Sequence, residues 1–447
     1  MGADLRVMQQ SGLLRSLRDR SSTMKKVASI ILCGGEGTRL HPLTLSLCKP
    51  AIHFGGKYRL IDIPLSNSIY ANCYKTYLIT QFLSSSLHRH IFETYHFLGR
   101  EQSGIEILTA EQKHSQAAWF KGTADAVRQN MDYLLSNPVD YFLILSGDQL
   151  YNIDFGEMLS FAQVTNADVI IASLPVTSSD AHRMGILQVN PHYEIVNFCE
   201  KPKVKRVLDE LRTSDEILEK EGFNPQNGKN YLGSMGIYLF KRKALIDILQ
   251  QDGREDFGKH LIPTLVAERK AKAYLYKGYW EDIGTIDTFY QANMGLLQPT
   301  PSFSFYNESR PVFSSRLDLP PATISQTWCK DVLLCEGGII DGSEITHSII
   351  GPRSVVRKGT VIRDSYIMGN DYYRSPIKDH FSMPEEPFIG ENCEISQAII
   401  DKNVIIGNGV KLINQQKLTN YDGQHIFIRN GIILVTRGAN LPDGFIL

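Results

Sequence analysis

Cysteine is scarce in this sequence, and its distribution excludes the sites that cysteines most often build. Seven cysteines are scattered over 447 residues, and no two of them form a Cys-x-x-Cys pair. An odd, scattered set of this kind predicts neither a zinc site nor a disulfide framework. Free thiols suit a reducing compartment, so we expect a cytoplasmic protein.

An excess of charge of either sign is also absent. The chain carries 47 basic and 48 acidic residues, a formal net charge of -1. A chain with this balance has no overall attraction to nucleic acid or to an anionic membrane. No apolar run approaches the roughly eighteen residues that a membrane span needs. We therefore expect neither nucleic acid nor a membrane among the partners.

The length is greater than one typical domain needs. At 447 residues with 43% hydrophobic residues, the chain suits two domains with full cores. Residues 1–23 hold arginines among scattered leucines and lack the apolar core of a secretory signal, so we expect a disordered tail. The alternative is an organelle transit peptide, which would direct the protein to a plastid.

Strand-like and helix-like segments alternate from residue 24 to residue 298. Residues 27–32, 141–146 and 168–176 are short apolar runs that suit buried strands, and 123–135 has a helical apolar stripe. This alternation predicts an α/β domain with a doubly wound, mostly parallel, Rossmann-like sheet. Ligands of such sheets bind at the carboxyl ends of the strands. Near the end of the domain, the hydroxyl of Thr285 is a suitable cap for a helix.

Beyond a proline-rich linker, residues 299–321, the sequence pattern changes. From 322 to 447 an apolar residue recurs about every six positions, with Gly or Asn at the bends, as in Ile349-Ile350-Gly351. This period predicts a left-handed parallel β-helix built from hexapeptide repeats. The alternative is an irregular antiparallel sandwich. Such β-helices also form acyltransferases, but His347 is the one histidine within the repeats proper, and we favour a surface role for it. We expect a scaffold that packs on the first domain and on other subunits.

The stretch from residue 27 to residue 62 carries the strongest functional signal. Its strand-like start ends in the glycine-rich turn Cys33 to Arg39, where backbone N–H groups can approach an anion closely. Arg39 adds a guanidinium fork and Lys49 a mobile point charge. Leu40 replaces the third glycine of the dinucleotide fingerprint, and the Gly-Lys-Ser/Thr of a P-loop is missing. The turn therefore predicts a nucleotide site of neither common kind, unless it is an ordinary surface turn.

Two acidic residues are suitable metal ligands if the substrates are a nucleoside triphosphate and a sugar phosphate. The sugar phosphate has a second pKa of about 6, so its oxygen is largely ionised at pH 7 and needs no general base. What remains is to neutralise the triphosphate and align attack on its α-phosphorus, which calls for cations and a magnesium ion. Asp148, after an apolar run, and Asp282, after Tyr279-Trp280-Glu281, could hold that ion. Each by itself is more often a helix cap or a solvated acid.

Longer motifs indicate which kind of nucleotide-binding protein this sequence resembles. The block GGEGTRLHPLT…KPAI…YRLID, with FGGKYRLID, LSNS and TQFLSSSL, resembles the signature of the ADP-glucose pyrophosphorylases, a group of sugar-nucleotide pyrophosphorylases. The likeness spans residues 27–447, and MGNDYY and IIDKNVIIGNGVKLIN look closest to the plant and cyanobacterial branch. It implies transfer of AMP from ATP to α-D-glucose 1-phosphate, giving ADP-glucose and pyrophosphate, for glycogen or starch synthesis. It also implies Mg²⁺, a homotetramer and a phosphorylated metabolite as effector.

The resemblance carries over to single residues. It implies catalytic roles for Arg39, Lys49 and Asp148, and a magnesium ion held by Asp148 and Asp282. The nucleotide contacts that we expect are Gly34, Gly35, Gly37, Thr38, Gln112 and Gly122. The sugar-phosphate contacts that the resemblance implies are Phe120, Gly185, Glu200, Lys201 and Ser234.

Departures from the family pattern leave alternatives open. Gln149 stands where the family usually has histidine, which puts positioning near the metal in question. Ser396, Gln397 and residues 427–429 stand where we expect activator-binding lysines, so Arg429 is the one candidate there for an effector contact. The protein could instead be a non-catalytic regulatory subunit, although such subunits usually have Arg39 or Lys49 altered. It could also use another base or sugar.

Overall fold

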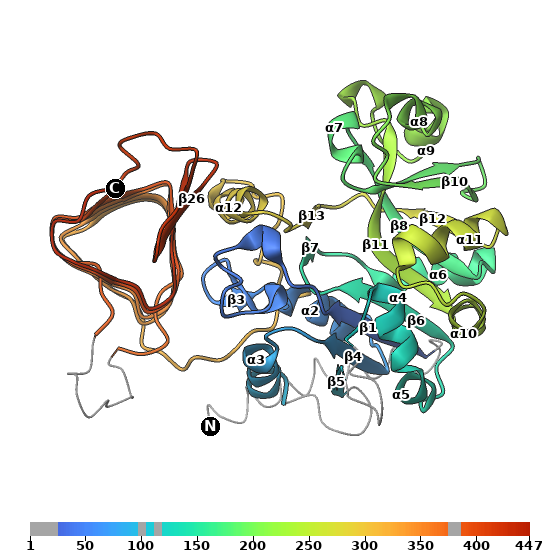
Figure 1. Ribbon diagram of the computed structural model, residues 1–447, viewed down its shortest axis with the longest axis horizontal. Helices are drawn as coiled ribbons and strands as arrows, with labels where there is room; N and C mark the ends of the chain where they lie inside the picture. The colour runs from blue at the N-terminus through green and yellow to red at the C-terminus, as the bar shows by residue number, and fades with distance from the viewer. Residues whose placement is uncertain (1–25, 97–103, 111–118, 374–385) are drawn as a thin grey trace.

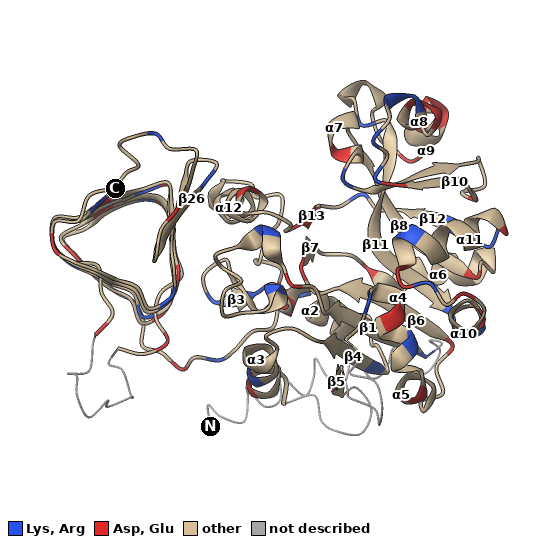
Figure 2. Ribbon diagram, viewed as in Figure 1, with Lys and Arg blue, Asp and Glu red and all other residues tan. Residues whose placement is uncertain are grey.

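The computed structural model describes residues 26–96, 104–110, 119–373 and 386–447 (Figure 1). An α/β domain and a β-helix lie side by side along the long axis of the molecule. The tail that we expected at residues 1–23 and the predicted contact Gln112 lie outside the described residues. Figure 2 shows acidic and basic residues interspersed over both domains, in line with the balanced composition.

A nine-stranded sheet forms the centre of the first domain within the described residues. Its path runs β10-β9-β11-β6-β1-β4-β5, with β8 beside β11 and β12 beside β8. The neighbours β6, β1, β4 and β5 are parallel, and β11 is antiparallel to β6 and β8. The strands are β1 (Val27–Cys33), β4 (Lys75–Thr80), β5 (Ile105–Thr109), β6 (Tyr141–Ser146), β8 (Val169–Val176), β9 (Gly185–Val189), β10 (Ile195–Glu200), β11 (Tyr231–Lys241) and β12 (Ala271–Leu275).

Helices cover both faces of this sheet because its strands alternate between two apolar cores. In β1, Ala28 and Ile30 belong to one core, while Ile31 and Cys33 belong to the other. The first core includes residues of α4 (Thr123–Gln129), α5 (Met131–Leu135), α9 (Asp215–Lys220), α10 (Arg242–Gln251) and α11 (Ile262–Ala267). The second includes residues of α2 (Asp62–Tyr70), α3 (Ser85–Tyr95) and α6 (Phe155–Thr165). The α/β prediction is confirmed.

The helix stripe predicted over residues 123–135 is interrupted. It forms as α4 and α5, which meet at Asn130. Asn130 has ψ 12°, outside the helical range, and its side-chain amide donates to the carbonyl of Ala126 at 2.8 Å. This bond satisfies the Asn130 amide at the break, but Asn67 and Asn293 make the same bond one turn back inside continuous helices, so it does not by itself end a helix.

The predicted cap at Thr285 is present. Its hydroxyl accepts from the backbone N–H of Thr288 at 3.2 Å, and the Thr288 hydroxyl accepts from the Thr285 N–H at 3.0 Å. This reciprocal pair begins α12 (Ile286–Met294), whose buried face packs between the two domains.

The second domain is a parallel β-helix, as the six-residue period predicts. Its coils stack in register, so that Ile345, Ile362, Ile395 and Leu412 align through successive coils and are all buried. Figure 1 shows the coils end-on as a triangular outline. Its strands include β14 (Thr323–Ser325), β15 (Trp328–Leu334), β16 (Ile339–Asp341), β17 (Glu344–Ile350), β19 (Val361–Arg363), β21 (Glu394–Ser396), β22 (Ala398–Ile400), β24 (Lys411–Leu412), β26 (Ile426–Arg429) and β27 (Ile432–Val435).

His347 lies on the outside of this β-helix. Its Nδ1 is 2.8 Å from a carboxylate oxygen of Asp364, and its side chain is 42% exposed. It does not line the large cleft of the first domain. This placement matches the surface role that we favoured over acyl transfer.

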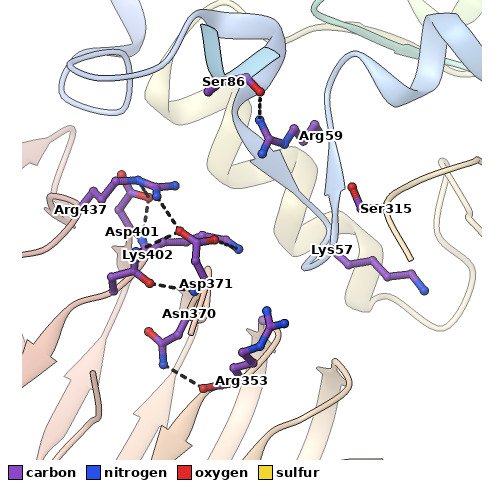
Figure 3. Close-up of polar contacts among 12 residues, drawn as sticks. Lys57, Arg59, Ser86, Ser315, Arg353, Asn370, Asp371, Asp401, Lys402 and Arg437 are labelled. Carbon is purple, nitrogen blue, oxygen red and sulfur yellow. Dashed lines mark hydrogen bonds and ion pairs between the residues drawn. The ribbon is translucent and has the colours of Figure 1, made fainter. Parts of the chain in front are cut away.

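The two domains share an apolar core and, beside it, a cluster of charged side chains. The apolar part joins Phe54 and Phe289 of the first domain to Ile349 and Leu434 of the β-helix. The polar part, which we call the junction cluster, consists of Arg59, Asp371, Asp401, Lys402 and Arg437 (Figure 3).

Asp371 is the centre of the junction cluster. Its two carboxylate oxygens accept from Lys402 Nζ at 2.9 Å and from Arg437 Nη1 at 2.8 Å. Burial would raise the pKa of Asp371, but the charges of Lys402 and Arg437 hold it below its ordinary value. On the facing domain, Arg59 donates to the carbonyl of Ser86 at 3.2 Å. Arg59 and Asp371 therefore interact through their charges across the boundary between the domains.

Candidate active site

A cleft of about 1010 Å³ opens at the carboxyl ends of the central strands. It brings together most of the residues that the sequence singled out. Those lining it are Gly34, Gly35, Arg39, Lys49, Phe120, Gly122, Asp148, Gly185, Glu200, Lys201, Ser234 and Asp282. A cleft of this size with convergent polar groups can hold a nucleotide and a second small substrate.

The glycine-rich turn after β1 presents bare backbone to this cleft. A Cβ placed on Gly35 would meet nothing within 4 Å, so its backbone is open to a ligand. Gly37 has φ 65°, and a Cβ there would lie 3.0 Å from Thr44 Cγ2 and 3.2 Å from Lys49 Cβ. Only glycine fits that left-handed position without strain. Gly37 and Thr38, which opens the 3₁₀ turn η2 (Thr38–Leu40), shape the turn from outside the cleft lining.

Two short strands bring the predicted metal ligands together. β7 (Gln149–Tyr151) pairs antiparallel with β13 (Trp280–Asp282), with Asp282 opposite Gln149. Asp148, one residue before β7, therefore lies beside Asp282. Lys49 Nζ joins them, 2.5 Å from Asp148 Oδ2 and 3.7 Å from Asp282 Oδ1. The Ser146 hydroxyl donates a short hydrogen bond to the other oxygen of Asp148.

The two carboxylates have opposite pKa shifts. Burial would raise the pKa of Asp148, but the ammonium and hydrogen bond of Lys49 and the hydrogen bond from Ser146 lower it below its ordinary value. Burial and the charge of Asp148 raise the pKa of Asp282. Burial alone would lower the pKa of Lys49, yet the two carboxylates raise it above its ordinary value. The ion pair is therefore charged at neutral pH.

The donor set fits a magnesium ion. Mg²⁺ is commonly held by one or two carboxylates, with water and substrate phosphates completing its coordination. Asp148 and Asp282 could supply two hard oxygen ligands beside the glycine-rich turn. Within the described residues no group of three or more His, Cys, Asp or Glu side chains is placed to hold a metal ion.

The guanidinium of Arg39 also lies beside Asp282. A Cβ on Gly284 would lie 3.3 Å from Arg39 Nη2 and 3.1 Å from Asp282 Oδ2. Glycine at position 284 therefore leaves room for the guanidinium to approach the carboxylate, and Arg39 is one of the charges that oppose the raised pKa of Asp282. Cations and carboxylates alternate around a site that could take up phosphate.

The opposite side of the cleft holds the residues expected to contact a sugar phosphate. Lys201 has φ 49°, and its Nζ lies 3.6 Å from Glu200 Oε1. A Cβ on Gly185 would lie 2.8 Å from Glu200 Oε2, so glycine there leaves space for the carboxylate. Burial raises the pKa of Glu200, an effect to which Asp256 adds and which Lys201 opposes. Ser234 is 9% exposed and its hydroxyl accepts from the N–H of Gly236 at 3.2 Å.

Phe120 and Gly122 lie on the segment that crosses the cleft. The N–H of Phe120 donates to Gln81 Oε1 at 2.6 Å. A Cβ on Gly122 would lie 2.4 Å from the carbonyl oxygen of Glu255, so the backbone there packs too closely for any other residue. Trp119 is 59% exposed and stacks on Phe82 with ring centroids 5.3 Å apart. The stacked pair Phe82 and Trp119 is therefore part of the cleft and not of the core.

Several cleft residues escaped the sequence reasoning. Arg183 and Asp256 line the cleft, but no motif marks them, and Gln81, which also lines it, lies in the quoted stretch TQFLSSSL without having been given a role. Gln149 was noticed only as a departure from the family, whereas the structure gives it two partners. Its Nε2 donates to the carbonyl of Met235 at 2.9 Å, and Trp280 Nε1 donates to its Oε1 at 3.3 Å.

Arg429 lies far from the cleft, on β26. Its guanidinium donates to the carbonyls of Tyr421 at 3.0 Å and Ile428 at 2.9 Å, and lies 2.5 Å from Asp422 Oδ1. An effector role for Arg429 stays a prediction, in which an anion would have to replace Asp422.

Comparison with known families agrees with this geometry. Residues 28–299 match the family model described as nucleotidyl transferase. The chain belongs to the nucleotidyl transferase family. Residues 317–446 match the GLGC left-handed parallel beta-helix domain, and the two together are the architecture of the ADP-glucose pyrophosphorylases. The predicted resemblance is confirmed at this level, while the plant and cyanobacterial branch stays a prediction.

Membership of the nucleotidyl transferase family gives the cleft a general role. It implies a nucleotide and a sugar phosphate as substrates, and such enzymes generally use divalent metal ions.

None of the described helices is both long enough and apolar enough to span a membrane.

Proposed function

We propose that the protein transfers AMP from ATP to α-D-glucose 1-phosphate, releasing pyrophosphate and forming ADP-glucose. The observation that carries this proposal is the meeting of Lys49, Asp148 and Asp282 beside the glycine-rich turn, with Glu200 and Lys201 across the same cleft. A non-catalytic subunit would not need an intact set of these groups.

In this proposal each residue has a chemical task. Backbone N–H groups of Gly34 and Gly35 hold the triphosphate, and Arg39 and Lys49 neutralise the charge that builds up as pyrophosphate leaves. Lys201 holds the sugar phosphate, whose ionised oxygen attacks the α-phosphorus without a general base. A bound Mg²⁺ would draw charge from the phosphate oxygens.

The carboxylates and the sugar-side groups complete the assignment. Asp148 and Asp282 would hold the metal, and Glu200 would accept hydrogen bonds from glucose hydroxyls. Phe120, Gly185 and Ser234 would border the sugar, and Gly122 would border the nucleotide. The product would supply glycogen or starch synthesis, in the cytoplasm or, if residues 1–23 are a transit peptide, in a plastid.

The first test is pyrophosphate release by the purified protein with magnesium and glucose 1-phosphate, supplied in parallel with ATP, UTP, GTP or dTTP. We expect release with ATP alone. Release with another nucleotide instead would keep the reaction type and replace the base. Folded protein that releases none would favour the regulatory-subunit alternative, or an enzyme that is silent without its activator.

We also propose that the protein is a homotetramer in which the first coil of the β-helix contacts another copy. In the described residues β14 pairs on one side only, with β16. Ile324 aligns with the buried Ile340 and Val356, yet it is 51% exposed. Solenoids need their end coils covered, and open strand edges favour pairing. Replacing Ile324 with Lys should reduce the mass measured by light scattering, and an unchanged tetramer would place the contact elsewhere.

A phosphorylated effector has two candidate locations. Arg429 was expected from the sequence, but Asp422 and two carbonyls already use its guanidinium. At the junction cluster Arg59, Lys402 and Arg437 lie near one another, and we propose this as the alternative location. Activation by phosphorylated metabolites in the Arg429→Ala and Lys402→Ala variants would distinguish the two, since only one variant should lose it.

A further inference from the structure

Lys49 makes a contact that its proposed role toward the triphosphate does not explain. Its ammonium lies 2.5 Å from Asp148 Oδ2 and 3.7 Å from Asp282 Oδ1, between the two carboxylates assigned to the metal. The side chain is 10% exposed, so few water molecules are available to replace this contact. The ammonium faces one oxygen of each carboxylate, so a divalent cation bound by the same two carboxylates has to compete with its positive charge.

The stem of Lys49 also borders the anion-binding turn. A Cβ on Gly37 would lie 3.2 Å from Lys49 Cβ and 3.8 Å from Lys49 Cγ, so the stem packs against this turn. The backbone of Lys49 is held in the 3₁₀ turn η3 (Lys49–Ala51), which begins immediately before Pro50. A flexible four-carbon stem anchored here can direct its ammonium to the carboxylates or to phosphates on the turn.

We propose that the Lys49 ammonium occupies the metal-binding carboxylates while the nucleotide site is empty, and moves to the triphosphate when nucleotide binds. The proposal rests on the nucleotide site proposed above. In consequence, Lys49 couples the binding of the metal ion to the binding of the nucleotide. Divalent metal binds weakly to the protein alone and more tightly once phosphates have drawn the ammonium away, and by reciprocity metal strengthens nucleotide binding.

The test measures metal binding without turnover. Free Mn²⁺ is counted by electron paramagnetic resonance in titrations of the full-length protein without nucleotide. The Lys49→Met variant should bind Mn²⁺ at least about fivefold more tightly than the wild type, the lower end of typical coupling factors. Adding a non-hydrolysable ATP analogue should tighten Mn²⁺ binding in the wild type more than in Lys49→Met.

Matched variants separate displacement from a general change of charge. Lys201→Met removes one positive charge from the same cleft, but Lys201 contacts Glu200 and neither metal-binding carboxylate. It should gain less Mn²⁺ affinity than Lys49→Met. Lys49→Arg keeps the charge and should stay close to the wild type. Asp148→Asn should remove the Mn²⁺ site.

The proposal is overturned if Lys49→Met binds Mn²⁺ no more tightly than the wild type, or if Lys201→Met gains as much. Should Lys49→Met fail to fold, the wild type alone decides: Mn²⁺ affinity that is the same with and without the ATP analogue contradicts the coupling. Mn²⁺ binding is measured without catalysis, so a protein with no adenylyl transfer could still support or refute it.

Discussion

Two buried lysines, Lys49 in the cleft and Lys402 at the junction cluster, show how surroundings decide what a charge does. Each is paired with an aspartate, and they are 8% and 5% exposed. Two carboxylates overcome burial and raise the pKa of Lys49. Burial lowers the pKa of Lys402, and the guanidinium groups of Arg437 and Arg59 lower it further, against the pull of Asp371. The first arrangement suits exchange with another cation, whereas the second holds cations together around one carboxylate.

The largest expected effect is on the cleft side of this comparison. Asp148→Asn keeps the shape of the side chain but removes the charge that holds Lys49 and would hold the metal. Pyrophosphate release should fall about a hundredfold to a thousandfold, the range seen when one key electrostatic contact is removed. Removing one partner of this buried ion pair should also lower the thermal midpoint, so activity is compared at a temperature where both proteins are folded, and unchanged activity would refute the metal assignment.

On the junction side the expected effect is on stability. Asp371→Asn leaves Lys402 and Arg437 without their shared carboxylate and should lower the free energy of unfolding by about 2 kcal/mol. This is less than for a fully buried pair, because the Asp371 side chain is 41% exposed and partly screened. Denaturant unfolding measures the change.

The lowered pKa of Asp371 fixes the sign of its pH dependence. Its stabilising contribution is fully present above the ordinary aspartate pKa and is lost as the pH falls toward the lower folded-state value. The difference between the wild type and Asp371→Asn should therefore shrink on acidification. A difference that grows on acidification would contradict this assignment.

A smaller loss is expected from Gln149, which connects the cleft's carboxylate strands to β11. Gln149→Met removes its two bonds with Met235 and Trp280 while keeping the volume, so kcat should fall about tenfold, which corresponds to a loss of about 1.4 kcal/mol in transition-state stabilisation. Gln188→Met is the matched control, because Gln188 also donates to a carbonyl at 2.9 Å but lies outside the cleft lining. Equal losses in both variants would refute a positioning role for Gln149.

The smallest effect should come from the cap of α12, the helix that packs between the two domains. Thr285→Ala removes the cap hydroxyl and should lower the free energy of unfolding by about 1 kcal/mol. Thr285 also lines the cleft. A raised KM in addition to the lower free energy of unfolding would therefore indicate that Thr285 contacts a ligand.

Local patterns in the sequence predicted the fold and several of the residues that line the cleft. The apolar run that became β1, the glycine turn after it and the hexapeptide period all act between residues close in the chain. Such signals need no knowledge of distant contacts. The break at Asn130 was missed because the apolar stripe continues from α4 into α5, so the periodicity by itself predicts one helix.

The sequence by itself determined the strands, the glycine-rich turn and the coils of the β-helix, because hydrophobic periodicity and glycine geometry are local. Only the tertiary structure decided that β7 and β13 pair, which places Asp148, Asp282 and Lys49 in one group. It also decided that Arg59 of the first domain faces Asp371 and Lys402 of the β-helix. Meetings between charges far apart in the chain depend on the packing of whole domains, which no local pattern encodes.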